Sequence, residues 1–237
     1  MLLLVVNCKP SSLLSIKLPK SYQSQPSFLL PPPSTIFGVY ARGIGVALDL
    51  PQFEAQKLAM KTLINVSSNS LMPSTRSGAL IRRWRIESNG EVTIKSDAMV
   101  REFIHTSIIR LYFVVNEKEF KYRNPEQILY LCGYSCSRIG DTESIVSPFS
   151  IRVVRVSSIS INREVKLAGY VPEEVIKEVV SGDYTVTEMP TMYDAKKYKP
   201  YILPLSAREK HYIPSDLFVR FKDDVSCIEV DGGYVNV

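Results

Sequence analysis

Histidine and paired cysteine are scarce in this chain, and their scarcity limits the chemistry it can perform. The sequence contains 2 histidines and 4 cysteines, and no two cysteines stand in a C-x-x-C arrangement. This spacing favours neither a zinc site nor a disulfide framework, so we expect no metal and no cofactor. Unpaired cysteines are typical of a reducing compartment, and we therefore expect a cytoplasmic protein.

The sequence also lacks the motifs of the commonest enzymes. Gly38 and Gly43 have the glycine spacing of a P-loop, but the Lys and Ser/Thr that should follow are missing, so nucleotide hydrolysis is not expected. There is no G-x-G-x-x-G after a strand, no G-x-S-x-G and no H-E-x-x-H. The first apolar run, Leu2 to Val6, is too short for a signal peptide or a membrane span. It predicts a buried first strand and no membrane partner.

The composition is that of a folded and mildly basic protein. The 237 residues suffice for one large domain or two small ones, and 45% of them are hydrophobic. A formal net charge of +5 permits a nucleic-acid partner without requiring one. The positions of the basic residues must therefore decide whether the chain binds nucleic acid.

A run of three prolines precedes the first expected helix. Pro31 to Pro33 lack amide hydrogens and favour extended backbone, so the helix should follow them, with Ser34 or Thr35 as its cap, and should run to about Leu48. The first turn of such a helix exposes unpaired amides that suit an anion such as a phosphate. The start of this helix is therefore a candidate anion site.

A polar stretch and a basic hairpin come next. Residues 67–78 have little to bury and predict a mobile, projecting loop. Asn89-Gly90 between two strand-like segments predicts a hairpin, and basic residues with one tryptophan lie on it or beside it: Arg76, Arg82, Arg83, Trp84, Arg85 and Lys95. Such a ribbon could present guanidinium groups to phosphates and a ring to a base. Charged residues also protect exposed sheet edges from aggregation. A nucleic-acid contact and a solvated edge strand are therefore both open interpretations of this hairpin.

The order of the expected elements predicts an α+β fold. A strand, helices, a strand, the hairpin, a central strand at Ile108 to Val115, a helix capped by Asn124 and a strand at Ile145 to Val156 follow one another. This order is close to the β-α-β-β-α-β arrangement of ferredoxin-like (RRM-like) domains with an inserted hairpin. We predict such a domain over residues 1–160, with the insertion at about 67–97. Residues 161–237 should form a β-rich C-terminal extension packed on it, including a short helix at 172–180.

Two further residues are candidates for chemistry or binding. His105 could act as a general base in RNA cleavage. The simpler interpretation is a partly buried histidine bonded to backbone, because a metal-free ribonuclease needs a second acid–base group nearby. Arg138 lies in a loop with both charge signs, where it could bind a partner or pair with a surface carboxylate.

Three segments together resemble the Cas-five family of CRISPR-associated proteins, which belong to the RAMP superfamily. They are Pro31 to Gly38 at the first helix, Arg101 to Phe103 before the central strand, and Ser137 to Ser144 after the second helical region. The resemblance covers residues 1–156 well and the remainder loosely. The length of the chain favours the type I-A branch of the family.

The resemblance implies a non-catalytic RNA-binding subunit of a Cascade surveillance complex, with the hairpin as a thumb. Such a protein holds the five-prime handle of the CRISPR RNA (crRNA) and contacts the backbone subunit and the large subunit, with target DNA as a further candidate partner. The implied RNA-binding residues are Ser34, Thr35, Arg42, Arg76, Arg82, Arg83, Trp84, Arg85, Arg101 and Arg138. One branch of the family cleaves precursor RNA with Tyr, Lys and His groups. His105 would be the equivalent here, without an adjacent lysine, so a metal-independent endoribonuclease is the alternative function.

Overall fold

A four-stranded sheet lies at the centre of the protein, with the strand order β3-β6-β1-β7. The computed structural model describes residues 1–18, 24–88, 92–121, 124–161 and 163–237, with residues 83–88 and 92–97 described by their backbone alone. The central strands are β1 (Leu2–Pro10), β3 (Leu63–Ser70), β6 (Ile109–Val115) and β7 (Val146–Arg155). β1 pairs antiparallel with both β6 and β7. Both middle strands are buried on both faces, which explains their continuous apolar runs.

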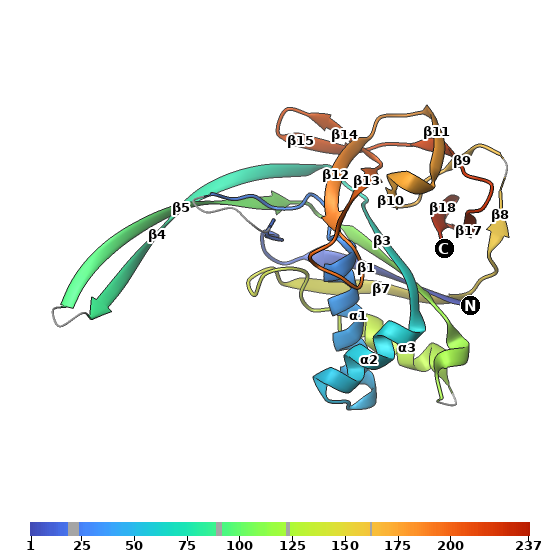
Figure 1. The fold of residues 1–237 in the computed structure, drawn as a ribbon, viewed down its shortest axis with the longest axis horizontal. Helices are drawn as coiled ribbons and strands as arrows, with labels where there is room; N and C mark the ends of the chain where they lie inside the picture. The colour runs from blue at the N-terminus through green and yellow to red at the C-terminus, as the bar shows by residue number, and fades with distance from the viewer. Residues whose placement is uncertain (19–23, 89–91, 122–123, 162) are drawn as a thin grey trace.

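The α-helices pack together on one face of this sheet (Figure 1). They are α1 (Pro33–Leu48), α2 (Gln52–Thr62) and α3 (Pro125–Tyr134), and the short 3-10 turn η1 (Glu117–Glu119) precedes α3. In α1, Ile36, Tyr40 and Ile44 recur at every fourth residue and are fully buried. The Tyr40 ring stacks on Phe113 of β6 with 5.7 Å between ring centroids. This stripe fixes α1 on the sheet and leaves its opposite side facing outward.

The other face of the sheet is covered by the last strands of the chain. β17 (Ser226–Val230) and β18 (Gly233–Asn236) form a hairpin with the short strand β8 (Ile159–Ser160). The side chains of Ile228 and Val235 pack against Leu3, Val5 and Tyr112 of the central sheet. Because neighbouring residues of a strand point to opposite faces, the run Leu2–Val6 serves both layers.

The strands β4 (Ser74–Ser88) and β5 (Val92–His105) form a long antiparallel hairpin that projects from the body (Figure 1). Pairing runs from Ser88↔Val92 to Thr75↔His105, so the hairpin is longer than the sequence predicted. The Asn89-Gly90 turn lies outside the described residues. At its base the hairpin joins β2 (Ser24–Gln25), β14 (Leu205–Arg208) and β15 (His211–Pro214) in one sheet of order β14-β15-β4-β5-β2.

The prediction of a projecting loop at residues 67–78 is wrong. Residues 67–70 continue β3, and β4 begins at Ser74. The serines are buried because their hydroxyls find partners: Ser67 donates to the Tyr170 carbonyl oxygen at 2.7 Å, and Ser70 lies 2.9 Å from the Thr106 hydroxyl. A polar residue can be buried without large cost when its hydroxyl is hydrogen-bonded.

The prediction of a helix at residues 172–180 is also wrong. A single 3-10 turn, η2 (Glu173–Val175), leads directly into strand β11 (Ile176–Ser181), which pairs with β16 (Phe218–Phe221). Val175, Ile176 and Val179 pack against a C-terminal apolar core. Branched side chains on a strand satisfy this packing better than a short helix with few apolar positions.

The remaining C-terminal elements are short strands, so the described fold is mostly β with few helices. They are β9 (Val165–Lys166), β10 (Val171–Pro172), β12 (Thr185–Pro190) and β13 (Tyr198–Leu203). Residues such as Tyr170, Met189 and Leu203 belong to the same apolar core as α1 and β1. The division at residue 160 stays a prediction. Within the described ranges, no helix has the length and apolar character needed to span a membrane.

Candidate functional site

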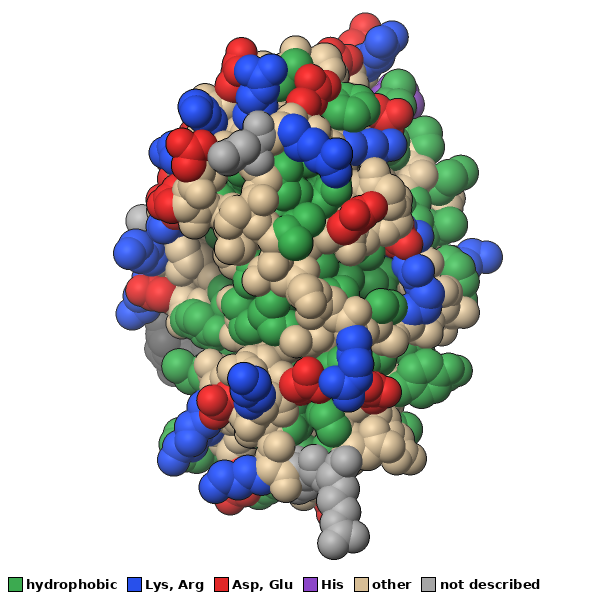
Figure 2. All heavy atoms as spheres, turned by 90° about the vertical axis from the view of Figure 1, so that its right-hand side faces the viewer, with side chains coloured by type: hydrophobic (Ala, Val, Ile, Leu, Met, Phe, Trp, Pro, Cys, Tyr) green, Lys and Arg blue, Asp and Glu red, His purple; other side chains and the backbone are tan. Residues whose placement is uncertain are grey.

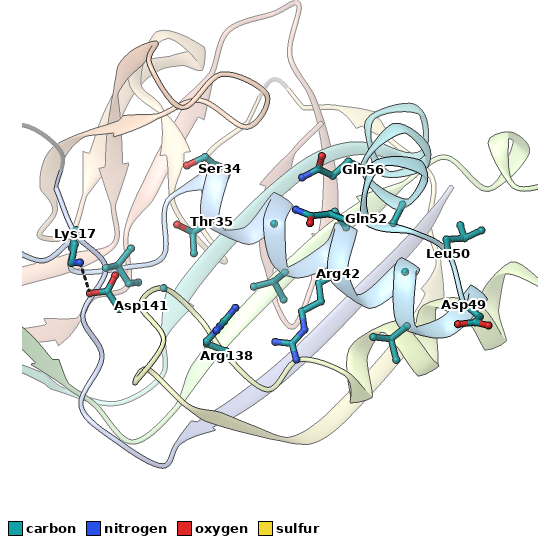
Figure 3. Close-up of a pocket in the computed structure, with 18 residues that line it drawn as sticks. Lys17, Ser34, Thr35, Arg42, Asp49, Leu50, Gln52, Gln56, Arg138 and Asp141 are labelled. Atoms are coloured by element: carbon teal, nitrogen blue, oxygen red, sulfur yellow. Dashed lines mark ion pairs between the residues drawn. The ribbon is translucent and has the colours of Figure 1, made fainter.

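A groove of about 870 Å³ runs along the outward side of α1, between α2 and the loop at residues 138–141 (Figure 3). Ser34, Thr35 and Arg42 of α1 line it together with Arg138 of the loop. The fold therefore gathers four of the residues that the sequence analysis proposed for RNA binding, from segments far apart in the chain. We call this cavity the α1 groove.

The loop that forms one wall of the α1 groove has a fixed backbone. Gly140 has φ of +96°, a conformation that side chains rarely adopt, and a Cβ there would lie 2.9 Å from the Ser15 carbonyl oxygen. The Asp141 amide donates to that same oxygen at 3.0 Å, and the Ser144 hydroxyl accepts from the Ser15 amide at 2.9 Å. These bonds hold Arg138 at the edge of the groove.

Arg101 holds the loop from beneath, in contrast to the RNA contact that was predicted for it. Its guanidinium lies 2.5 Å from Asp141 Oδ2 and 2.8 Å from Glu143 Oε2, and its Nε donates to the Ser15 hydroxyl at 3.0 Å. Only 8% of the residue is exposed. A buried guanidinium that is paired with the partly buried Asp141 and the exposed Glu143 is not available to a phosphate. The placement argues for a structural role of Arg101.

The charge presented by the α1 groove comes from Arg42 and Arg138. Both are exposed, and neither forms an ion pair with any residue that the structure describes. The carboxylate of Asp141, which also lines the groove, is neutralised by Arg101 and by Lys17 at 3.6 Å (Figure 3). Asp49 lies at the far end of the groove, after the last turn of α1. The part beside Arg42 and Arg138 therefore presents uncompensated positive charge.

The first turn of α1 leaves fewer free amides than the predicted anion site would use, and the anion site itself stays a prediction. Pro31 to Pro33 are buried, Pro33 is itself the first helical residue, and no side chain caps the helix. The amides of Thr35 and Ile36 both donate to the Pro32 carbonyl oxygen, at 2.9 and 3.1 Å. The prediction that Ser34 or Thr35 caps the helix is therefore wrong. Both residues lie in the first turn and line the groove with their side chains instead.

The hairpin arginines divide into paired and exposed residues. Arg76 is partly buried at the base, 5.4 Å above the Tyr212 ring and 3.7 Å from Glu102, so internal contacts occupy it. Arg82 is exposed further along β4. Arg83, Trp84 and Arg85 lie in β4, and their side chains are outside the described part of the structure. Of the two with described side chains, neither Arg76 nor Arg82 lines the α1 groove.

His105 is exposed, not partly buried as expected, and a second histidine that the sequence analysis missed stands in the same cross-strand row, two strands away. On β5 it pairs with Thr75 of β4, which in turn pairs with His211 of β15. Cross-strand partners share a face of the sheet, so the three side chains stand in one row. The Thr75 hydroxyl lies 3.2 Å from His211 Nδ1, and Arg208 continues the row on β14. No local signal predicts the β4–β15 pairing, because residues far apart in the chain form it.

The cysteines serve packing and not chemistry. Cys8, Cys132 and Cys136 are buried together, and Cys8 Sγ lies 3.5 Å from Cys136 Sγ. The hydrogen bond shared with Cys136 and burial raise the pKa of Cys8 far above its usual value, and burial raises the pKa of Cys132. Thiols in this state are poor nucleophiles. Among the described residues, no three His, Cys, Asp or Glu side chains come together as metal ligands.

The face at the right of Figure 1 lacks a comparable basic surface. Figure 2 shows lysine and arginine side chains interspersed with carboxylates on this face, with apolar side chains between them. Among the described ion pairs, Arg152 and Arg110 both contact Asp231 at 2.6 Å. Compensated charges of this kind give little attraction for a polyanion. The α1 groove and the hairpin are therefore the better candidates.

Comparison with known proteins first identifies the class of fold. No protein-family model matches the sequence. The structure is similar to a crystal structure of a CRISPR protein from Archaeoglobus fulgidus, with a TM-score of 0.66 and 17% identity over 100% of this chain and 98% of that chain. A chain of a CRISPR RNA-guided surveillance complex is more distantly similar, with a TM-score of 0.41 and 11% identity over 92% of this chain and 90% of that chain. The fold is that of a CRISPR protein.

A curated relative then narrows this class. The CRISPR-associated protein Cas5 of Methanocaldococcus jannaschii is 28% identical over 213 residues, which cover 83% of this chain and 84% of the relative. The similarity extends over most of both chains, so it concerns the body of the protein and not one motif. The predicted resemblance to the Cas-five family is confirmed, whereas the type I-A branch stays a prediction.

Proposed function

We propose that this protein is a non-catalytic subunit of a CRISPR effector complex that holds the five-prime handle of the crRNA in the α1 groove. One observation carries the proposal. Arg42 and Arg138 line the same groove as the hydroxyls of Ser34 and Thr35, and neither arginine has a carboxylate partner among the described residues. Guanidinium groups and hydroxyls are the donors that bind phosphate oxygens. The similarity to Cas5 supports the choice of crRNA as the ligand.

One face of the central sheet is covered, and this favours the α1 groove as the RNA-binding site. The chain order of the central strands and helices, with the sheet order β3-β6-β1-β7, supports a ferredoxin-like domain. RRM-type domains of that fold bind RNA on the open face of the sheet. Here Ile228 and Val235 occupy that face. RNA contacts on the opposite side, along α1, and on the hairpin as a thumb are therefore the arrangement we favour.

Exposed apolar side chains support contacts with protein subunits. Phe53 is 77% exposed and Met60 is 56% exposed, two turns apart on α2. Leu80 and Val100 face each other on the projecting hairpin, and both are exposed. Large exposed apolar side chains often mark protein interfaces. We assign these two surfaces to the backbone and large subunits, and the exposed lysines at residues 196–197 to target DNA.

The variant Arg42→Ala/Arg138→Ala tests the RNA site. With labelled handle RNA and fluorescence anisotropy, it should bind more weakly, and the slope of log K against log salt should fall by about 1.4, because two phosphate contacts are lost. The matched control is Lys177→Ala/Arg220→Ala, which removes two exposed basic residues from the C-terminal strands. An unchanged affinity and slope would contradict the proposal. No saturable binding by the unaltered protein would favour a protein-only scaffold.

A second candidate function is a metal-independent endoribonuclease, which the row of His105, Thr75 and His211 favours. One imidazole would take the proton of the 2′-hydroxyl as its oxygen attacks phosphorus, while the other gives a proton to the departing 5′-oxygen. The products would be a 2′,3′-cyclic phosphate and a 5′-hydroxyl. Incubating repeat RNA with the protein in EDTA decides between the candidates. A cut that His105→Ala abolishes supports the enzyme, whereas intact RNA favours the binding subunit.

A further inference from the structure

Gly38 is a glycine on the α1 groove that nothing within the protein requires. It lies inside α1, where glycine is less favourable than alanine, and a Cβ built there would meet no atom within 4 Å. The other glycines of the helix have an internal reason. A Cβ at Gly43 would lie 2.3 Å from Cys132 Sγ, and one at Gly45 would lie 3.2 Å from the Ala55 Cβ. Gly38 and Gly45 both line the groove, but among the three glycines only Gly38 has no neighbour that a Cβ would meet, so the helix backbone there is bare and open.

Two side-chain amides line the groove on the side opposite to the arginines. Gln52 and Gln56 are one turn apart on α2, and Figure 3 shows both side chains reaching toward α1, with Arg42 and Arg138 on the other side of that helix. Both glutamines are exposed, and neither side-chain amide is hydrogen-bonded to a residue that the structure describes. Each amide offers one acceptor and two donors, a combination that can bond the edge of a nucleobase.

The dimensions of the groove also exceed what a phosphate contact needs. Phosphates bind to exposed basic side chains without any cavity, whereas about 870 Å³ lies in the range of cavities that enclose a small molecule. The described lining residues include no aromatic ring on which a base could stack. A flat group can instead lie on helix backbone where no side chain intervenes, and Gly38 provides that surface.

We propose that the α1 groove binds one unstacked nucleotide, whose base lies against α1 at Gly38 and is read by Gln52 and Gln56. This inference rests on the proposed function, because it takes the ligand to be single-stranded RNA. The phosphate of the nucleotide contacts Arg42 and Arg138, and the base crosses α1 to the amides of α2. The groove thus selects for a base at one position of the RNA, in addition to holding its backbone.

Handle RNAs that lack one base at a time test the inference. The unaltered protein should bind most of these abasic RNAs like the complete RNA, and at least one of them about tenfold more weakly, since a base contact contributes roughly 1–3 kcal/mol. In the variant Gln52→Ala/Gln56→Ala this difference should shrink, while the salt dependence stays. Gln127→Ala on the exposed side of α3 is the matched control. Equal loss for every abasic RNA would overturn the inference.

The variant Gly38→Ala separates a ligand contact from a structural role. A helical alanine should raise the Tm by about 2–4 °C, yet it should lower RNA affinity about tenfold by filling the surface on which the base lies. Gly43→Ala should instead lower the Tm, because its Cβ would collide with Cys132.

The outcomes also separate this inference from the function on which it rests. A stabilised Gly38→Ala protein that binds RNA as tightly as the unaltered protein overturns the inference. If Arg42→Ala/Arg138→Ala still weakens binding in that case, the proposed function stands. If neither variant weakens binding, the proposed function fails as well.

Discussion

The arginines of the α1 groove and those at the base of the hairpin differ in what surrounds them. Arg42 and Arg138 are exposed and form no ion pair with the described residues, whereas Arg76 and Arg101 are held by carboxylates and rings of the protein itself. The four side chains have the same chemistry. Their neighbours, brought from distant parts of the chain, decide which of them can meet RNA and which of them shape the site.

The largest effect should follow from removing a paired arginine. Arg101→Ala leaves Asp141 and Glu143 without their guanidinium partner, and we expect about 3 kcal/mol lower free energy of unfolding, because Arg101 is buried. RNA affinity should also fall, since the loop that carries Arg138 loosens. Urea denaturation measures the first effect.

The exposed Arg155 provides the control for that variant. It pairs with Glu117 and Glu126 at the surface, so Arg155→Ala should lower the free energy of unfolding far less than Arg101→Ala does. If Arg101→Ala and Arg155→Ala lowered the free energy of unfolding equally, Arg101 would contribute no more to stability than a surface arginine.

A charge added to the groove should give the next largest effect. Thr35→Glu places a carboxylate beside the proposed phosphate path, and we expect about tenfold weaker RNA binding at low salt and a smaller loss at high salt. Thr187→Glu on β12 is the control for an added charge away from the groove. Equal affinity of the two variants, measured by anisotropy at two salt concentrations, would contradict RNA binding in the groove.

Removing two arginines of the hairpin should have a smaller effect. Arg82→Ala/Arg83→Ala should weaken handle binding and reduce the salt slope by up to about 1.4, if the hairpin contacts the backbone of the same RNA. Isothermal titration at several salt concentrations measures both quantities. An unchanged slope would remove the thumb assignment and leave the groove as the RNA site.

A change of pH should affect the stability of the fold and the RNA affinity of the groove arginines differently. Burial raises the pKa of Tyr201 to about 12 and also raises the pKa of Tyr40, on the buried side of α1, from an unfolded value of 10.0. The folded state therefore keeps protons that the unfolded state has lost. Stability should be constant below pH 10 and should fall above it, by about 1 kcal/mol per pH unit for each such tyrosine.

Arginine stays charged throughout that range, so RNA affinity should hold until the protein unfolds. Thermal melts between pH 8 and pH 11, with anisotropy in parallel, measure both quantities. A loss of affinity well before the loss of structure would show that groups other than arginine bind the RNA.

Local patterns in the sequence predict much of the fold. The proline run, the Asn124 cap and the apolar stripe of α1 all mark elements that the structure contains. Residues 67–70 and 176–181 were predicted wrongly because their strands depend on distant partners. From the sequence alone, a serine such as Ser67 predicts a loop. Its burial is explained only by the tertiary structure, in which the Tyr170 carbonyl accepts its hydrogen bond.

The candidate site was predictable only in part for the same reason. The groove contains three of the predicted residues, Thr35, Arg42 and Arg138. They were predictable as basic or hydroxyl residues in a helix and a loop that local sequence patterns indicate. The pairing of Arg101 and the placement of His211 in one row with His105 were not predictable, because both depend on tertiary contacts. Gln52 and Gln56 had no signal beyond their one-turn spacing on a helix.

The contact between β18 and β1 has a consequence for folding during synthesis. Val235 completes the layer on which Leu3 and Val5 depend, although these residues stand at opposite ends of the sequence. The first strand therefore leaves the ribosome long before the residues that shield one of its faces exist. Until then a nascent chain exposes an apolar sheet face that chaperones can bind.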